Sequence, residues 1–187
     1  MKFTKEEARR RVLNCAKQYQ QKLLNKKLIV IYRERKDNAI RYIEVAFYER
    51  NYQHLTGIEL LDEDGNVLHL QALPALMDVT KITKITGDYN NVRPYLFVNK
   101  VMGGVNFCLG LTRENTEYVP SSALLEDIKK VTDAPSQVLA IFEKDAKSEV
   151  YETVKHVAKG LNLNHIQLPD EIKNMIDLKN YVYKGKG

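Results

Sequence analysis

One amphipathic helical segment at the front of the chain is followed by a series of short, β-branched runs, and this arrangement limits the available fold classes. In residues 4–25, apolar side chains recur three or four positions apart, and Thr4 and Glu7 have capping-box spacing. From residue 28, runs rich in valine, isoleucine and tyrosine are separated by turn-forming residues. The sequence predicts an α+β fold, in which a basic N-terminal helix packs on a mainly antiparallel sheet of about six strands.

The expected strands fall into three antiparallel pairs, because each pair of β-rich runs is separated by a few turn-forming residues. The pairs are residues 28–32 with 40–48, 95–101 with 105–112, and 138–142 with 150–158. The last of these runs also fits helical spacing, but its valine, tyrosine and threonine content favours a strand. Its apolar positions therefore leave both alternatives open.

Shorter helices are expected at residues 74–80, at 123–131 with Ser121 or Ser122 as the cap, and from about residue 169. Residues 51–57 interrupt the strand pattern with polar side chains, and residues 87–91 are expected to form a loop. The acidic segment 62–66 resembles the start of a calcium loop, but Leu73 stands where a bidentate glutamate is needed. A hairpin turn at residues 65–66 is the better interpretation.

The length of 187 residues is sufficient for one domain with its own core. We expect an N-terminal helix at 1–27, a main α+β domain at 28–160 and a C-terminal helical extension at 161–187. Two cysteines without a Cys/His cluster argue against a disulfide scaffold and a zinc finger. No apolar stretch approaches 18 residues, and charges occupy the N-terminal positions where a signal peptide is apolar. We therefore expect a cytoplasmic protein with no membrane partner.

The basic residues are concentrated at the front of the chain. The formal net charge is +5, yet residues 1–36 contain 12 Lys and Arg against 3 Asp and Glu. Such asymmetry is typical of a protein that binds a polyanion, because basic side chains displace counterions from phosphates. A solvated helix face that is simply basic explains the composition equally well.

Three motifs, in order along the chain, resemble those of one nuclease family. Residues 47–58 read FYERNYQHLTGI and contain an N-(aromatic)-x-H-L-T-G signature. Residues 118–128 look like a Y-x-P-x-(S/T)-L-L-x-x-D-I stretch, and residues 138–144, with Tyr151 and 158–160, supply the third motif. Over residues 28–160 the chain resembles the fourth family of the phage-associated barnase, EndoU, colicin and RelE-like nucleases.

The resemblance implies a RelE/barnase-EndoU-colicin-like ribonuclease fold, with an N-terminal helical part packed on a four-stranded antiparallel sheet. It also implies RNA cleavage without a metal or cofactor. Such cleavage needs a base for the 2′-hydroxyl, an acid for the leaving 5′-oxygen and donors around the phosphorane. The sequence shows no carboxylate cluster suited to magnesium, in keeping with this route. Residues 54–92 show less helical pattern than the family leads us to expect.

Four residues are predicted to be catalytic: His54, Thr56, Ser122 and Lys144. His54 is the candidate base or acid, because histidine is the side chain that titrates near neutrality. Thr56 and Ser122 offer hydroxyls to a phosphate, Ser122 near a helix N-terminus, and Lys144 offers an ammonium to the developing negative charge. Each also has a structural explanation: a surface histidine, a turn, a helix cap and a strand end. His156 is the reserve candidate for the acid.

Four further residues are predicted to bind RNA: Arg50, Tyr151, Arg9 and Arg10. The leading hypothesis is a metal-independent endoribonuclease that cleaves by 2′-hydroxyl transesterification, toxin-like and from a phage or mobile element. The alternative is a non-catalytic nucleic-acid-binding or phage interaction protein with the same fold. RNA is the expected partner; an inhibitor protein and the oligomeric state are left open.

Overall fold

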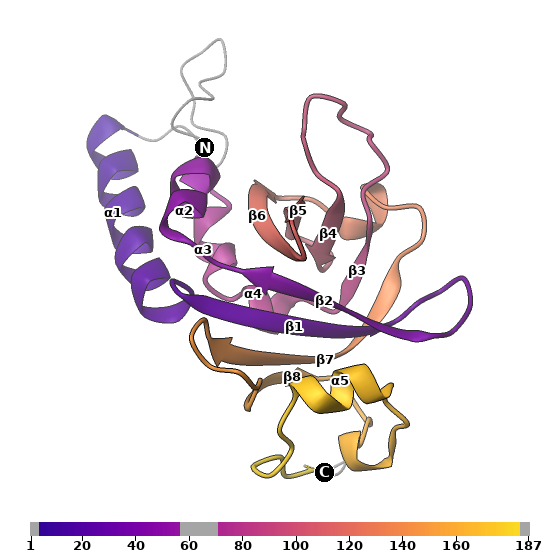
Figure 1. Cartoon of the computed structure of the whole chain (residues 1–187). Helices are drawn as coiled ribbons and strands as arrows, with labels where there is room; N and C mark the ends of the chain where they lie inside the picture. The colour runs from indigo at the N-terminus through magenta and orange to yellow at the C-terminus, as the bar shows by residue number, and fades with distance from the viewer. Residues whose placement is uncertain (1–3, 57–70, 184–187) are drawn as a thin grey trace.

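The computed structural model describes residues 4–56 and 71–183 and has the predicted α+β architecture (Figure 1). Its α-helices are α1 (Lys5–Lys22), α2 (Glu49–Thr56), α3 (Leu73–Leu76), α4 (Val79–Ile82) and α5 (Asp170–Met175), with 3₁₀ turns η1 (Ile128–Lys130) and η2 (Leu163–His165). Its strands are β1 (Lys26–Arg33), β2 (Ile40–Ala46), β3 (Ile85–Asp88), β4 (Lys100–Gly103), β5 (Cys108–Glu114), β6 (Glu117–Leu124), β7 (Ser136–Asp145) and β8 (Thr153–Val157).

The strands described form one sheet in the order β1-β2-β6-β5-β4-β3-β7-β8. Since β7 also pairs with β1, seven of these strands close into a ring, and β8 lies outside it on β7. All pairings are antiparallel except that of β2 with β6, which meet in parallel at Val45 and Tyr118. The described part of the sheet is thus larger than the six strands predicted and the four that the resemblance implies.

The N-terminal helix α1 begins where the sequence predicts. The Thr4 hydroxyl accepts a hydrogen bond from the Glu7 backbone amide at 3.2 Å, and the Thr4 amide donates to the Glu7 carboxylate at 2.8 Å. Cys15 and Tyr19 are buried on one face of the helix, in the core that also contains residues of β1 and β2. Arg9 and Arg10 are exposed on the helix surface. The prediction of a basic helix packed on the sheet is confirmed.

Strand β1 is covered on both faces. Leu28 and Val30 contribute to the core beneath α1 and α2, whereas Ile29 and Ile31 pack against the C-terminal segment that includes α5. Figure 1 shows these two layers, with α1 and α2 on one side of the sheet and α5 on the other. A strand buried on both faces has a continuous apolar run instead of alternation, which explains the Leu-Ile-Val-Ile sequence.

Several predicted elements differ from the structure. Residues 49–56 form helix α2 where a polar interruption was expected, and residues 87–88 belong to β3 where a loop was expected. Residues 95–98 are not a strand, because Leu96 and Val98 donate to the nearby carbonyls of Arg93 and Leu96. The predicted turn at 65–66 lies outside the described residues.

The helix predicted at residues 123–131 is also wrong. Strand β6 continues to Leu124, with Ser122 opposite Gly110 and Leu124 opposite Cys108 on β5. Pairing with β5 therefore overrides the capping tendency of the two serines. What remains of the predicted helix is the short turn η1, whose cap is Asp127.

We expect Gly103→Ala to destabilise the fold strongly. A Cβ atom at this position would lie 2.3 Å from the Phe107 carbonyl oxygen and 2.6 Å from the Cys108 Cα, both of which are backbone atoms. The strand pair must therefore move apart, at a cost of about 1–3 kcal/mol or more in the free energy of unfolding. Urea denaturation measures this loss. Gly104→Ala is the matched control, because its Cβ meets the Ile82 carbonyl oxygen at 3.0 Å and should cost less; an equal loss contradicts the packing explanation.

Candidate functional site

Charged and tyrosine side chains gather where the start of β1 and the end of β7 meet β2, β6 and α2. Lys27 on β1 lies directly opposite Lys144 on β7, and the Glu117 carboxylate at the start of β6 reaches Lys27. We call this group the Glu117 cluster. Its members are Lys27, Glu44, Tyr48, Arg50, Glu117, Lys144 and Tyr151.

Glu117 is held by two donors. The Lys27 Nζ lies 2.5 Å from one carboxylate oxygen, and the Tyr48 hydroxyl donates to the other. Burial raises the pKa of Glu117, but the hydrogen bonds from Lys27 and Tyr48 outweigh burial and leave the pKa below its usual value. Glu117 is therefore a carboxylate at neutral pH, and its two oxygens retain lone pairs that can accept further hydrogen bonds.

Arg50 connects this carboxylate to helix α2. Its guanidinium lies 4.6 Å from the centroid of the Tyr48 ring, and its Nη2 atom lies 2.6 Å from the Glu114 carboxylate. His54 lies one helical turn further along α2, so the two side chains emerge on the same exposed face. Contacts thus run from Glu117 through Tyr48 to Arg50, and His54 follows Arg50 by four residues on α2.

Lys144 and Tyr151 form the other half of the cluster. The Lys144 ammonium lies 4.4 Å from the Tyr151 ring centroid and donates to the Glu149 carbonyl at 3.1 Å. Tyr151 is fully buried, and its hydroxyl donates to Glu44 at 2.5 Å. Burial and this hydrogen bond raise the pKa of Tyr151. Its position is that of a residue that holds Lys144 in place, not of one with a surface open to RNA.

The four residues predicted to be catalytic are not brought to one point. Lys144 is a member of the cluster, whereas His54 is on α2, four residues after Arg50. Thr56 is the last residue of α2. Ser122 lies in the interior of β6, five residues beyond Glu117 and thus about 16 Å along the strand. Its predicted place at a helix N-terminus is wrong, because it is a strand residue that lies opposite Gly110 on β5.

Sequence reasoning missed four members of the cluster: Lys27, Glu44, Tyr48 and Glu117. Lys27 precedes one predicted strand, and Glu44 and Tyr48 lie within the next, but nothing local distinguishes them from other polar residues of strands. Glu117 approaches Lys27 because β2 and β6 meet in parallel, a pairing between segments about 70 residues apart. A long-range pairing of this kind leaves no signal in a single sequence.

His156, the reserve candidate for the acid, belongs to a different group. Strands β3 and β8 pair with the same edge of β7, one after the other. The Val138 amide of β7 donates to the carbonyl of Lys84, which precedes β3, and the Leu139 carbonyl accepts from the amide of Ala158, which follows β8. At this junction the Lys84 Nζ lies 3.1 Å from the His156 Nδ1. Burial and the Lys84 charge lower the pKa of His156 to about 4. His156 is therefore neutral above mildly acidic pH.

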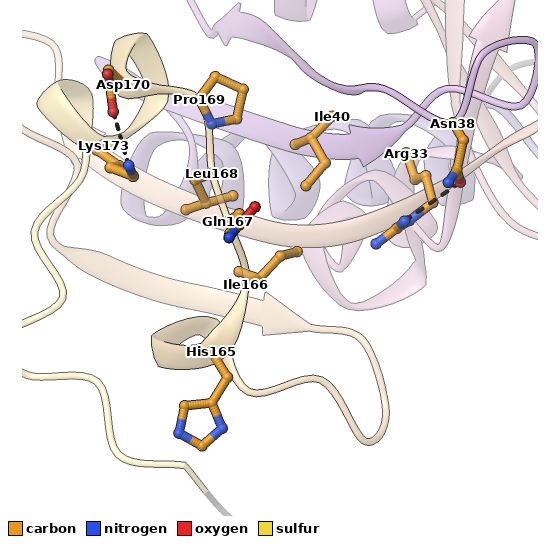
Figure 2. A pocket seen from close by; sticks show the side chains of 10 residues that line it. All are labelled: Arg33, Asn38, Ile40, His165, Ile166, Gln167, Leu168, Pro169, Asp170 and Lys173. Atoms are coloured by element: carbon orange, nitrogen blue, oxygen red, sulfur yellow. Dashed lines mark hydrogen bonds and ion pairs between the residues drawn. The ribbon is translucent and has the colours of Figure 1, made fainter.

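A wide groove of about 890 Å³ lies between the β1–β2 loop and residues 165–173 (Figure 2). Two of its basic side chains are engaged within it: Arg33 donates to Asn38 at 3.4 Å, and Lys173 pairs with Asp170 at 2.8 Å. Ile40 of β2 lines the groove, four residues and about 13 Å along the strand from Glu44. The groove is therefore separate from the Glu117 cluster.

Within residues 4–56 and 71–183, no three His, Cys, Asp or Glu side chains come together as a metal site. In the same ranges, no helix has the length and apolar character needed to cross a membrane.

The state of His156 predicts that stability falls in acid. Its pKa is about 4 in the folded chain against 6.5 for an ordinary histidine, so the unfolded chain binds more protons between these values. The contribution of His156 to the free energy of unfolding is therefore complete above pH 6.5. It decreases as the pH falls toward 4, by about 1–2 kcal/mol after allowance for the partial exposure of the side chain.

Urea unfolding at pH 7.5 and 4.5 measures this effect, and His156→Asn should reduce the difference between the two pH values. His165→Asn is the matched control, because His165 is an exposed histidine of η2. The same pH difference in the wild type and in His156→Asn contradicts the prediction.

The comparisons with known proteins bear on the front of the chain. Residues 11–68 match the model of a family described as phage-Barnase-EndoU-ColicinE5/D-RelE like nuclease4. This range contains Lys27, Tyr48, Arg50 and His54, whereas Glu117 and Lys144 lie beyond it. No curated protein and no solved structure matches the chain. The predicted family resemblance is confirmed over residues 11–68, where the chain is similar to phage-associated nucleases of the barnase, EndoU, colicin and RelE type.

Proposed function

We propose that the protein is a metal-independent endoribonuclease that cleaves RNA by attack of a 2′-hydroxyl on the adjacent phosphate. One observation carries this proposal: residues 49–56 of the family signature form α2, which places Arg50 against Tyr48, a donor to the Glu117 carboxylate, and His54 one helical turn further along. A nuclease family model over residues 11–68 supports the reaction class. The products are a 2′,3′-cyclic phosphate and a free 5′-hydroxyl.

Glu117 and His54 are the proposed proton carriers. Glu117 is ionised, so it can accept the 2′-hydroxyl proton as that oxygen attacks phosphorus. His54, on the other side of Arg50, donates a proton to the leaving 5′-oxygen as the P–O bond breaks. An acid and a base on opposite sides of the phosphate suit an in-line displacement, in which the attacking and leaving oxygens are at opposite apices.

The phosphate is proposed to bind at Arg50. A guanidinium has five N–H donors, so Arg50 can keep its contact with Glu114 and still donate to two phosphate oxygens. Lys27 and Tyr48 hold Glu117 in position, and Lys144 adds positive charge nearby. Thr56 remains a proposed phosphate donor from the same helix. Ser122 has no part in this scheme, because about 16 Å of strand separates it from Glu117.

A second candidate function is RNA binding without cleavage. It is favoured by the pairing of the cluster's cations with internal partners: Lys27 with Glu117, Arg50 with Glu114, and Lys144 with the Tyr151 ring. Cations held by internal partners are kept in fixed positions, where they can contact RNA phosphates without taking part in a reaction.

Cleavage of a labelled RNA in EDTA tests the proposal. We expect cyclic-phosphate ends from the wild type, and a decrease in kcat of about 10²- to 10⁴-fold in His54→Ala and in Glu117→Gln. His165→Ala is the control for loss of an exposed histidine and should cleave normally. Unchanged cleavage by His54→Ala removes His54 from the mechanism, and a requirement for Mg²⁺ rejects the metal-independent route. Binding of RNA without any product supports the second candidate function.

The basic face of α1 is proposed to hold RNA outside the reaction centre. Arg9 and Arg10 are exposed, so replacing both by glutamate should weaken the binding of RNA of any sequence. The slope of the logarithm of the binding constant against the logarithm of the salt concentration should fall by about 2. Fluorescence anisotropy from 50 to 200 mM salt measures this slope. Lys159→Glu, an exposed charge reversal after β8, is the control. An unaltered slope in the double variant assigns the basic face to solvation alone.

A further inference from the structure

Two aromatic side chains are strongly exposed on the loop between β3 and β4. Tyr95 is 71% exposed and Phe97 is 86% exposed, the largest fraction for a large hydrophobic residue in the described part of the chain. Figure 1 shows this loop extending beyond the ends of the strands that it connects. Isolated apolar residues on a surface need no explanation, but two aromatic rings two residues apart on one loop do.

The rings are exposed on a loop that is held in place. The Tyr89 hydroxyl donates to the Arg93 carbonyl at 3.2 Å and accepts from the Arg93 amide at 3.0 Å. The Arg93 guanidinium pairs with Glu126, and the Thr112 hydroxyl donates to the Phe97 carbonyl at 2.5 Å. These bonds fix the backbone on both sides of the rings. The loop therefore presents Tyr95 and Phe97 to solvent at little further cost in chain entropy.

The same loop is tied to the strand that leads to the proposed cleavage site. Thr112, which holds Phe97, lies two residues and about 7 Å along β5 from Glu114, the partner of Arg50. Between them, Arg113 is exposed, and its backbone amide is fixed by the Asn99 side chain at 2.8 Å. Because side chains alternate along a strand, Thr112 and Glu114 share one face of β5, so the loop that carries the rings is held on the face that bears the partner of Arg50. The Arg113 side chain is on the other face, where its Nε atom donates to the Asn115 carbonyl at 3.3 Å.

We propose that Tyr95 and Phe97 form a stacking platform for the bases of single-stranded RNA that leads to the proposed phosphate site at Arg50. This inference rests on the proposed function and names its substrate class. Every base has a π-face, so stacking tolerates any sequence, but a duplex hides those faces within its own stack. The platform therefore selects unpaired RNA. The loop carries Asn90 and Arg93, and the face of β5 that holds it leads to Arg50, so a nucleic acid suits the rings better than an apolar protein surface does.

Binding of a non-cleavable RNA tests the platform in the full chain. The probes are a 2′-O-methyl 12-nucleotide single strand and a hairpin duplex of the same composition, each followed by fluorescence anisotropy. We expect Tyr95→Ala and Phe97→Ala each to weaken single-strand binding by about 5- to 150-fold, with little change for the duplex. Phe97→Trp should retain affinity and Phe97→Leu should not, because stacking needs an aromatic face. Val92→Ala, an exposed aliphatic on the same loop, is the matched control.

Three results overturn the platform. Equal losses for single strand and duplex assign the rings to general adhesion, and full affinity in Phe97→Leu assigns them to apolar contact. Unchanged binding in both alanine variants, with a wild-type dimer that Phe97→Ala dissociates in sedimentation, assigns the loop to a second copy of the chain. Because the probe cannot be cleaved, these results do not depend on catalysis. Normal RNA cleavage by the wild type, together with any of these three results, rejects only this inference. Single-strand binding that depends on the two rings, without any RNA cleavage, rejects only the endoribonuclease proposal.

Discussion

The pairing of β1 with β7 is the interaction on which the rest of the structure depends. It runs the full length of β1, from Lys26 opposite Asp145 to Arg33 opposite Gln137, and it closes the sheet into a ring. It also places an apolar strand between two cores, one beneath α1 and α2 and one beneath α5. Without this pairing, Ile29 and Ile31 would not be packed beside the residues of β7, and the C-terminal segment would lack the apolar surface on which it packs.

The same pairing creates the electrostatic problem that the candidate site solves. It places Lys27 directly opposite Lys144, and like charges at directly opposed positions of a sheet repel each other. Glu117 neutralises the first lysine, and the face of the Tyr151 ring attracts the second. Both partners come from segments remote from β1, so the closed sheet and the assembled cluster depend on each other.

The parts of the fold that the sequence predicts are those decided locally. The capping box of α1, the β1–β2 hairpin and the paired runs of β7 and β8 all depend on residues within about 20 positions of one another. The errors arise where distant pairing overrides local preference. Ser121 and Ser122 favour a helix cap in isolation, but a neighbouring β5 makes them strand residues. Likewise, residues 95–98 have the composition of a strand, yet Arg93 and Thr112 hold them as a loop.

The family signature itself shows how one segment serves both structure and chemistry. Because residues 49–56 are helical, Arg50 and His54 lie one turn apart on one face of α2. Asn51 and Leu55 lie one turn apart on a second face, about 100° around the helix axis. The second pair is buried: Leu55 joins the core, and the Asn51 side chain accepts from the Tyr48 amide and donates to the Pro120 carbonyl on β6. Those two bonds fix α2 against the strand that begins with Glu117. The asparagine of the signature is therefore a docking residue, and it sets the distance between the proposed acid on α2 and the proposed base on β6. Within the signature, one face of the helix carries Arg50 and His54 and another face docks α2 on β6.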